Sequence, residues 1–230
     1  DRNVIMVKDN TAELIDTPKS LSENNKEILK IKANISADNT LSVSSSFNFS
    51  GGMYDIFLPL VSLSPADQKD AMRKRYDYLQ FSNIDVTNLK NDRTEATINF
   101  DLNFKANNYS KSLGSDIYFR AIPFLDSDFY LESTDRKLPI EIPFGFTDDY
   151  EIEYTIPENY KFSENLAPAT LDSEFGSFSM EFVNQDKKLL VKRKFMLKKG
   201  TFPPDKISDY INFRKKANKL DHTKILITKL

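Results

Sequence analysis

The sequence predicts an all-β protein, built from β-sandwich or jelly-roll modules and carrying two short helices. Three observations lead to this prediction. Apolar and polar residues alternate with a period of two over several stretches. Helical start signals stand out at only two places. The 230 residues include 18 Phe and 10 Tyr and are 40% hydrophobic, which is enough to form a sizeable buried core. The mean hydropathy is negative, as is typical of a globular protein.

Alternating stretches follow one another along most of the chain. Residues 28–35 and 41–49 alternate on either side of an Asp38-Asn39 turn, which is typical of a β-hairpin with one buried face. Two shorter extended pieces, "DIYFRAIPF" and "LPIEIPFGF", are interrupted by Pro and are predicted at sheet edges. Residues aligned on one face of their stretch are Leu41, Val43, Ser45, Phe47 and Phe49, then Ala96, Ile98, Phe100, Leu102 and Phe104, and Tyr150, Ile152, Tyr154 and Ile156.

Two stretches break this period and are predicted to be helices. In the first, Ser64 is a candidate N-cap and Pro65 occupies the first helical position, which predicts a helix over 65–80. In the second, two prolines precede apolar residues at helical spacing, which predicts a helix over 204–219. The closing "KILITKL" is expected to form a last strand.

A domain boundary is expected within residues 131–147. Charge and Pro density rise in this segment, and a new set of alternating strands begins after it. We therefore expect a β-rich module over 1–140, which holds the first helix, and a C-terminal β-sandwich module over 141–230, which holds the second.

Missing residue types exclude several kinds of chemistry. The chain has no Cys, so a disulfide framework, a thiol nucleophile and a Cys-based zinc site are excluded. Its one histidine, His222, cannot form a multi-histidine metal site and leaves little scope for histidine general-base catalysis. The chain has no Trp, which weakens a sugar-stacking interpretation, although Tyr and Phe could substitute. No apolar run approaches the roughly 18 residues of a membrane span, so none is expected.

Charge is distributed unevenly along the chain. Residues 1–184 carry a net charge of −12 and residues 185–230 carry +10, which gives the overall −2. The basic residues around 189–198 fit the return strand of a hairpin with 176–184, and Lys192, Lys194 and Lys198 would lie on its solvent face. No nucleic-acid-binding fingerprint accompanies these lysines, so nucleic acid is not an expected partner.

A few polar and aromatic residues are candidate sites, and for each of them we favour a structural explanation. His222 suits the C-terminal cap of the last helix. The oxygens of Asp126–Asp128 and of residues 147–150 could serve calcium but suit turn capping better. Phe129 and Tyr130 are expected to pack between sheets, and Glu151 and Glu153 to lie on a solvent face. We predict no catalytic, cofactor-binding or metal-binding residue.

The most specific stretch of the sequence is residues 150–230. It contains Pro157 with Tyr160, the motif "FGSF" at 175–178, Lys199-Gly200 and Pro203-Pro204, followed by the closing helix and strand. This order resembles the C-terminal module, a domain of unknown function, of the transglutaminase-like proteins found mainly in Bacteroidetes. Upstream, "NVIMV" and "ELIDTP" resemble the segment that follows the papain-like catalytic core in that family, and "PFGF" resembles the entry to its last domain.

This resemblance implies a non-catalytic function. The family's Cys-His-Asp core has no counterpart here, so no catalytic residue is carried over. The resemblance implies an accessory region that packs on or positions that core, or binds a partner protein, in the periplasm or at the cell surface. The alternative is an exported module that binds glycan or polypeptide. Because Asp is the first residue and no charged-then-apolar leader follows, we expect a processed protein or part of a longer one.

Overall fold

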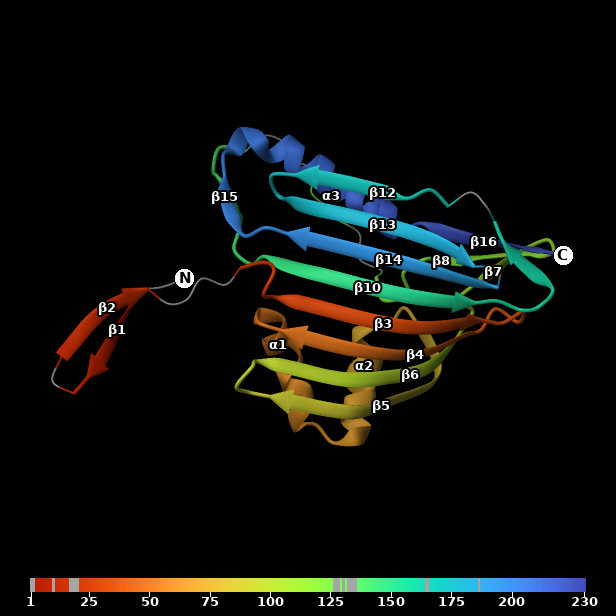
Figure 1. Cartoon of the computed structure of the whole chain (residues 1–230), viewed down its shortest axis with the longest axis horizontal. Helices are drawn as coiled ribbons and strands as arrows, with labels where there is room; N and C mark the ends of the chain where they lie inside the picture. Colours follow the sequence, from red (N-terminus) through yellow and green to blue (C-terminus); the bar gives the residue numbers. More distant parts are fainter. Residues whose placement is uncertain are drawn as a thin grey trace.

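An eight-stranded sheet forms the body of the molecule (Figure 1). The computed structural model describes residues 3–9, 11–16, 21–125, 129, 131, 136–163, 166–185 and 187–230. In spatial order the strands of the large sheet are β12 (Ala169–Ser173), β13 (Gly176–Gln185), β14 (Lys188–Leu197), β10 (Phe146–Thr155), β3 (Lys26–Ile35), β4 (Leu41–Ser50), β6 (Thr97–Asn107) and β5 (Gln80–Asp92).

The centre of this sheet is a parallel pair in an otherwise antiparallel arrangement. Strands β3 and β10 run parallel over nine paired positions, from Lys26 opposite Thr147 to Asn34 opposite Thr155. The strands on either side of this pair come from the two halves of the chain, so the halves share one sheet. The division into modules at residues 1–140 and 141–230 stays a prediction, and its boundary falls where the short strand β9 (Ile140–Ile142) begins.

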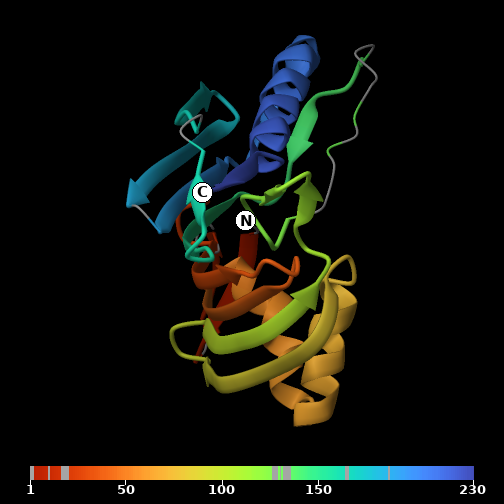
Figure 2. The ribbon, with the colours of Figure 1, turned by 90° about the vertical axis from the view of Figure 1, so that its right-hand side faces the viewer.

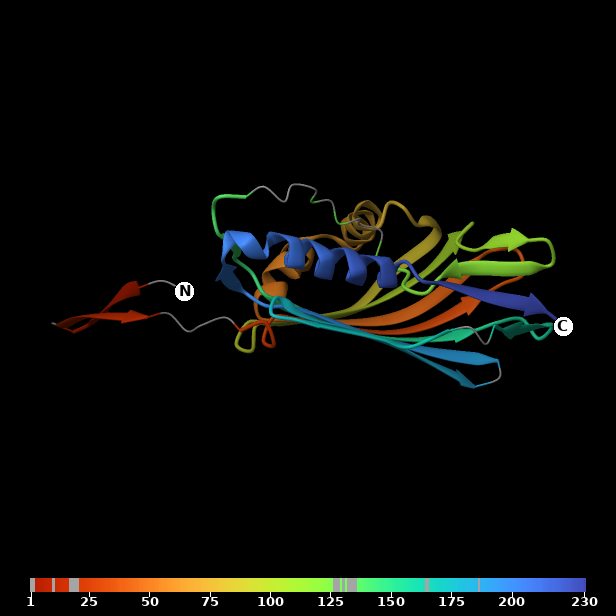
Figure 3. The same cartoon turned by 90° about the horizontal axis from the view of Figure 1, so that it is seen from above.

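One face of the large sheet is buried beneath helices and a smaller sheet (Figures 2 and 3). The smaller sheet has the strand order β11 (Tyr160–Phe162), β16 (Lys224–Lys229), β8 (Asp116–Arg120) and β7 (Lys111–Leu113). Aromatic rings fill the core: Phe47 stacks on Phe100 with ring centroids 4.9 Å apart, and Phe195 stacks on Phe213 of the last helix. The all-β prediction is confirmed, with the predicted alternation placing one face of each long strand in this core.

Three α-helices are present among the described residues, one more than predicted. Helix α2 (Pro65–Arg75) begins as predicted, because the Ser64 hydroxyl accepts a hydrogen bond from the Asp67 amide. It ends before the predicted residue 80, where strand β5 begins. Helix α3 (Ile207–Asp221) follows a 3-10 turn at Pro204–Lys206. The short α1 (Gly52–Phe57), which leads into the 3-10 helix η1 (Leu58–Ser62), was not predicted.

The glycine of the "FGSF" motif, Gly176, has a structural role. It begins β13 with a φ of 154°. A Cβ at this position would collide with the backbone carbonyl oxygen of Met196 on the neighbouring strand. Only glycine therefore allows β13 and β14 to approach each other this closely at that point.

A two-stranded hairpin stands apart from this body (Figure 1). It consists of β1 (Asn3–Lys8) and β2 (Thr11–Asp16), which pair only with each other. A second small ribbon joins β9 to β15 (Gly200–Phe202). None of the described hairpin residues belongs to the buried core.

Candidate functional site

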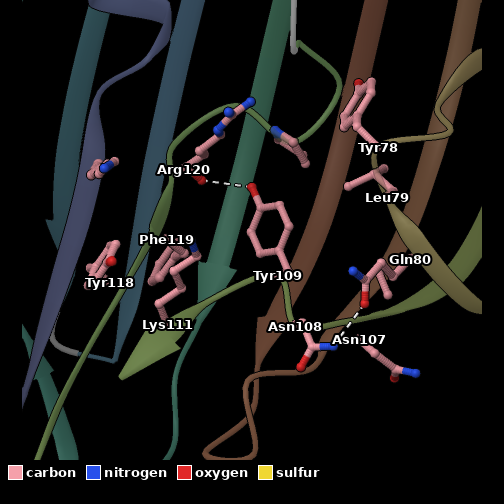
Figure 4. Close-up of a pocket in the computed structure, with 13 residues that line it drawn as sticks. Tyr78, Leu79, Gln80, Asn107, Asn108, Tyr109, Lys111, Tyr118, Phe119 and Arg120 are labelled. Atoms are coloured by element: carbon pink, nitrogen blue, oxygen red, sulfur yellow. Dashed lines mark hydrogen bonds between the residues drawn. The ribbon is translucent and has the colours of Figure 1, made fainter. Parts of the chain in front are cut away.

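A pocket of about 310 Å³ opens where the small sheet meets the ends of β5 and β6 (Figure 4). Its walls come from the loop before β5, the loop from β6 to β7, and strands β7, β8 and β16. The apolar part of the lining comprises Leu79, Ala106, Phe119 and Pro123. Its polar part comprises Tyr78, Gln80, Asn107, Asn108, Tyr109, Lys111, Tyr118, Arg120 and Lys224.

The charge of this pocket has one sign. Lys111, Arg120 and Lys224 line it, and none of its lining residues is acidic. Lys224 lies over the Tyr118 ring, with Nζ 5.3 Å from the ring centroid, which is a cation–π contact. At the mouth, the Asn108 amide donates a hydrogen bond of 2.8 Å to Gln80 Oε1. We name this the basic pocket.

Two tyrosines, the partly buried Tyr109 and the buried Tyr154, hold the inner wall of the basic pocket in place. The Tyr109 hydroxyl donates a hydrogen bond of 2.8 Å to the backbone carbonyl of Arg120 (Figure 4). From the large sheet, the Tyr154 hydroxyl donates to the carbonyl of Ala121 at 3.1 Å. Burial raises the pKa of Tyr109 well above its usual value, so this hydroxyl keeps its proton and remains a donor. The wall is therefore preorganised.

A second polar constellation is centred on Arg193, which is only 3% exposed. Its guanidinium donates two hydrogen bonds to Asp221 of α3, at 2.7 and 2.9 Å, and one of 3.0 Å to Asp148 of β10. It also lies 4.9 Å from the centroid of the Tyr150 ring. Burial alone would lower the pKa of Arg193, but the hydrogen bonds and charge of Asp221, with Asp148, raise it, so the arginine stays charged.

Glu27 lies beside this constellation and is 8% exposed. It is opposite Asp148 in the parallel pair, and its Oε1 accepts a hydrogen bond of 2.9 Å from the Tyr150 hydroxyl. Burial and the charge of Asp148 raise the pKa of Glu27 to about 7. Each hydrogen bond of Arg193 already goes to a protein carboxylate, so we interpret this group as structural and as joining α3 to the sheet. We call it the buried charge network; its members are Glu27, Asp148, Tyr150, Arg193 and Asp221.

The residues considered for calcium do not converge in the structure. Residues 126–128 lie outside the described residues. Of the second group, the Thr147 hydroxyl donates to the Ser22 carbonyl, Asp148 binds Arg193, and Asp149 is exposed on the opposite face of β10. Among the residues that the structure describes, no three His, Asp or Glu side chains are grouped so that they could hold a metal ion.

His222 and Phe129 lie near the end and the middle of α3. His222 is the C-terminal cap of the helix, as predicted, and its Nδ1 lies 2.8 Å from the Asn218 carbonyl oxygen. Phe129 packs edge-on against Tyr210 of α3, with Arg214 over its ring, rather than between sheets. Tyr130 is outside the described residues.

The outer face of the large sheet is polar, and the lysines of the basic stretch lie on it. Lys192 and Lys194 are exposed on β14, as predicted, and Lys198 is exposed just after the strand. Lys192 is opposite Glu151 of β10, which is also exposed, and Lys188 forms an ion pair of 3.0 Å with Glu153. The candidate acids thus face solvent beside lysines, not each other across a cleft.

Charge reversal on this face should leave the fold intact. We expect the triple variant Lys192→Glu, Lys194→Glu and Lys198→Glu to lose little stability, because exposed ion pairs contribute about 0–1 kcal/mol each. The measurement is urea denaturation followed by far-UV circular dichroism. Complete unfolding of the variant in buffer would contradict the exposed position of these lysines.

Together, these features describe an all-β protein with a basic pocket and a buried charge network. Residues 115–227 match the model of a family described as a domain of unknown function, DUF3858. The prediction that the C-terminal part contains a domain of unknown function is thus confirmed. Searches of curated proteins and of solved structures gave no match. Among the described residues, no helix combines the length and apolar composition needed to cross a bilayer.

Proposed function

We propose that the chain is a non-catalytic accessory module that docks onto another protein domain through its β1–β2 hairpin. The resemblance to transglutaminase-like proteins suggests that this domain is their papain-like core, and that the protein acts in the periplasm or at the cell surface. The basis for docking is the exposed apolar face of the hairpin.

Ile5 is opposite Leu14 and Val7 is opposite Ala12, and residues two apart on a strand point to the same side. These four side chains therefore lie on the same side of the hairpin. Ile5, Val7 and Leu14 are 68%, 71% and 66% exposed. An isolated two-stranded hairpin is marginally stable in water, and large apolar side chains on a protruding ribbon favour burial against a partner. We call this side the hairpin face.

The occupant expected on the hairpin face is an apolar surface of the transglutaminase-like core. In the resemblance, "NVIMV" and "ELIDTP" match the segment that follows this core, and these residues make up β1 and β2. Sequence adjacency would keep the hairpin at a high effective concentration near the core, so a modest apolar contact would suffice to hold it.

The test is a binding measurement between this chain and the core domain produced as a separate polypeptide. We expect the double variant Ile5→Lys and Leu14→Lys to weaken binding at least tenfold, since each lysine places a charge in an apolar contact. The matched control is Thr11→Lys with Glu13→Gln. It changes net charge by the same amount on the opposite side of the hairpin and should bind like the parent chain. Absence of binding by the parent chain, or equal loss in both variants, would overturn the proposal.

The alternative function, an exported module that binds glycan or polypeptide, has one observation in its favour. This observation is the basic pocket, which combines aromatic, amide and cationic side chains in a single concave site. The pocket and the hairpin lie at opposite ends of the molecule (Figure 1), so both functions can coexist in one chain.

A further inference from the structure

The geometry points to the basic pocket as a binding site for a small sugar acid, a uronic-acid unit whose carboxylate is held between Lys111 and Lys224. This inference does not depend on docking through the hairpin, because it uses none of the hairpin residues. It requires three properties of the site: a lining that holds positive but no negative side chains, a wall that suits a sugar ring, and a fixed shape.

Strand pairing concentrates positive charge on one face of the small sheet. Lys111 of β7 is opposite Tyr118 of β8, and Lys224 of β16 is opposite Arg120. Tyr118 and Arg120 are two residues apart, so all four side chains project from the same face.

Within the described part of the chain, neither Lys111 nor Lys224 forms an ion pair. The outer face of the large sheet is arranged differently. Its lysines on β3 and β14 lie opposite acidic residues of β10, namely Asp149, Glu151 and Glu153. The two lysines of the pocket therefore differ from the lysines of this outer face, which lie beside acidic residues. A carboxylate between them would supply the charge that the lining lacks.

The remaining lining suits the body of a sugar rather than a bare anion. Aromatic rings of Tyr109 and Tyr118 offer apolar surface for ring C–H groups, and the side-chain amides of Gln80 and Asn108 at the mouth can both donate and accept hydrogen bonds from hydroxyl groups. A volume of about 310 Å³ accommodates one small organic molecule and lies near the lower limit of ligand pockets. Hydrogen bonds from Tyr109 and Tyr154 to the backbone at Arg120 and Ala121 fix the wall before any ligand arrives.

The experiment is a titration of the full chain with glucuronate, followed by two-dimensional amide NMR. For a ligand of this size we expect a Kd on the order of 1 mM, with shift changes confined to the pocket residues of β7, β8 and β16. Glucose, which lacks the carboxylate, and acetate, which lacks the ring, should each bind about tenfold or more weakly. Raising the salt concentration should weaken glucuronate binding as well.

Two variants and one control locate the site. Lys111→Gln and Lys224→Gln should each weaken glucuronate binding by about tenfold, because each removes a charge-assisted hydrogen bond. Lys198→Gln, an exposed lysine on the outer face of the large sheet, should leave binding unchanged. Equal binding of glucose would show that charge plays no part, and equal binding of acetate would reduce the site to one for simple anions. Either result, or no binding of glucuronate, overturns the inference without bearing on the hairpin.

Discussion

Replacing Arg193 with Met should destabilise the protein by roughly 3–5 kcal/mol, the range measured when one partner of a buried ion pair is removed. The guanidinium is 3% exposed and contacts two carboxylates, so its loss leaves Asp148 and Asp221 as uncompensated charges. Methionine keeps similar volume and flexibility, which limits the contribution of a cavity. The measurement is the free energy of unfolding from urea denaturation, with circular dichroism and tyrosine fluorescence as independent probes.

The matched control is Arg73→Met. Arg73 also binds an aspartate at 2.9 Å, Asp70, but its side chain is 47% exposed. Because an exposed pair contributes little, we expect a change within about 0.5 kcal/mol. A combined variant, Arg193→Met with Asp148→Asn, should recover part of the loss, since it removes one of the two stranded charges. If Arg193→Met were no worse than Arg73→Met, the network would have no role in holding α3 to the sheet.

Much of this network could have been anticipated from strand phase alone. Arg193 shares its face with Leu189, Val191 and Phe195, so the alternation that predicts the strand also implies a buried arginine, an inference that the sequence analysis did not draw. Glu27 precedes Leu29 by two residues, and Asp148 precedes Tyr150 by two. A charged residue in phase with an apolar face indicates a buried partner of opposite charge.

The identity of those partners could not be predicted, because it depends on long-range pairing. Asp148 and Arg193 meet through the antiparallel pairing of β10 with β14, and Glu27 joins them through the parallel pair of β3 with β10. The alternating pattern within a strand gives its buried face but does not give its neighbour or its direction. Nothing local to residues 26–35 distinguishes pairing with 146–155 from pairing with another strand.

The basic pocket was hidden from sequence reasoning for a similar reason. Lys111 lies on a three-residue strand without an alternating pattern, and Lys224 is more than a hundred residues further along. Their convergence depends on β8, which pairs with both β7 and β16. Strand β5 was missed because its register is shifted at two places, near Phe81 and Thr87, which interrupts the period-two pattern.

The titration of Glu27 should make the protein less stable as the pH rises from about 4.5 to about 7. The pKa of Glu27 is about 7 in the folded protein, whereas its ordinary value is 4.5. Below 4.5 both the folded and unfolded states hold the proton. Between the two values only the folded state holds it, so stability falls with increasing pH. Above 7 both states are ionised and the folded protein holds a buried carboxylate beside Asp148.

Glu27→Gln should remove this dependence. Gln has nearly the shape of the protonated acid and keeps an oxygen to accept the hydrogen bond from Tyr150. We expect the variant to be more stable than the parent chain at pH 8 by up to about 3 kcal/mol, and nearly equal to it at pH 4.5. The measurement is the free energy of unfolding of both proteins at several pH values across this interval.

Taking the difference between the two proteins cancels the groups that titrate in both. The control is Glu151→Gln on β10, where the carboxylate is exposed on the outer face of the same sheet. Its difference curve should be flat to within about 0.5 kcal/mol. Two positive charges, Arg193 and Arg75 at the end of α2, lower the pKa of Glu27. A flat curve for Glu27→Gln, or one in which the parent chain gains stability as the pH rises, would mean that these two arginines hold Glu27 ionised. Burial and the charge of Asp148 would then be the weaker influences on this carboxylate, and the network would carry one more negative charge at neutral pH.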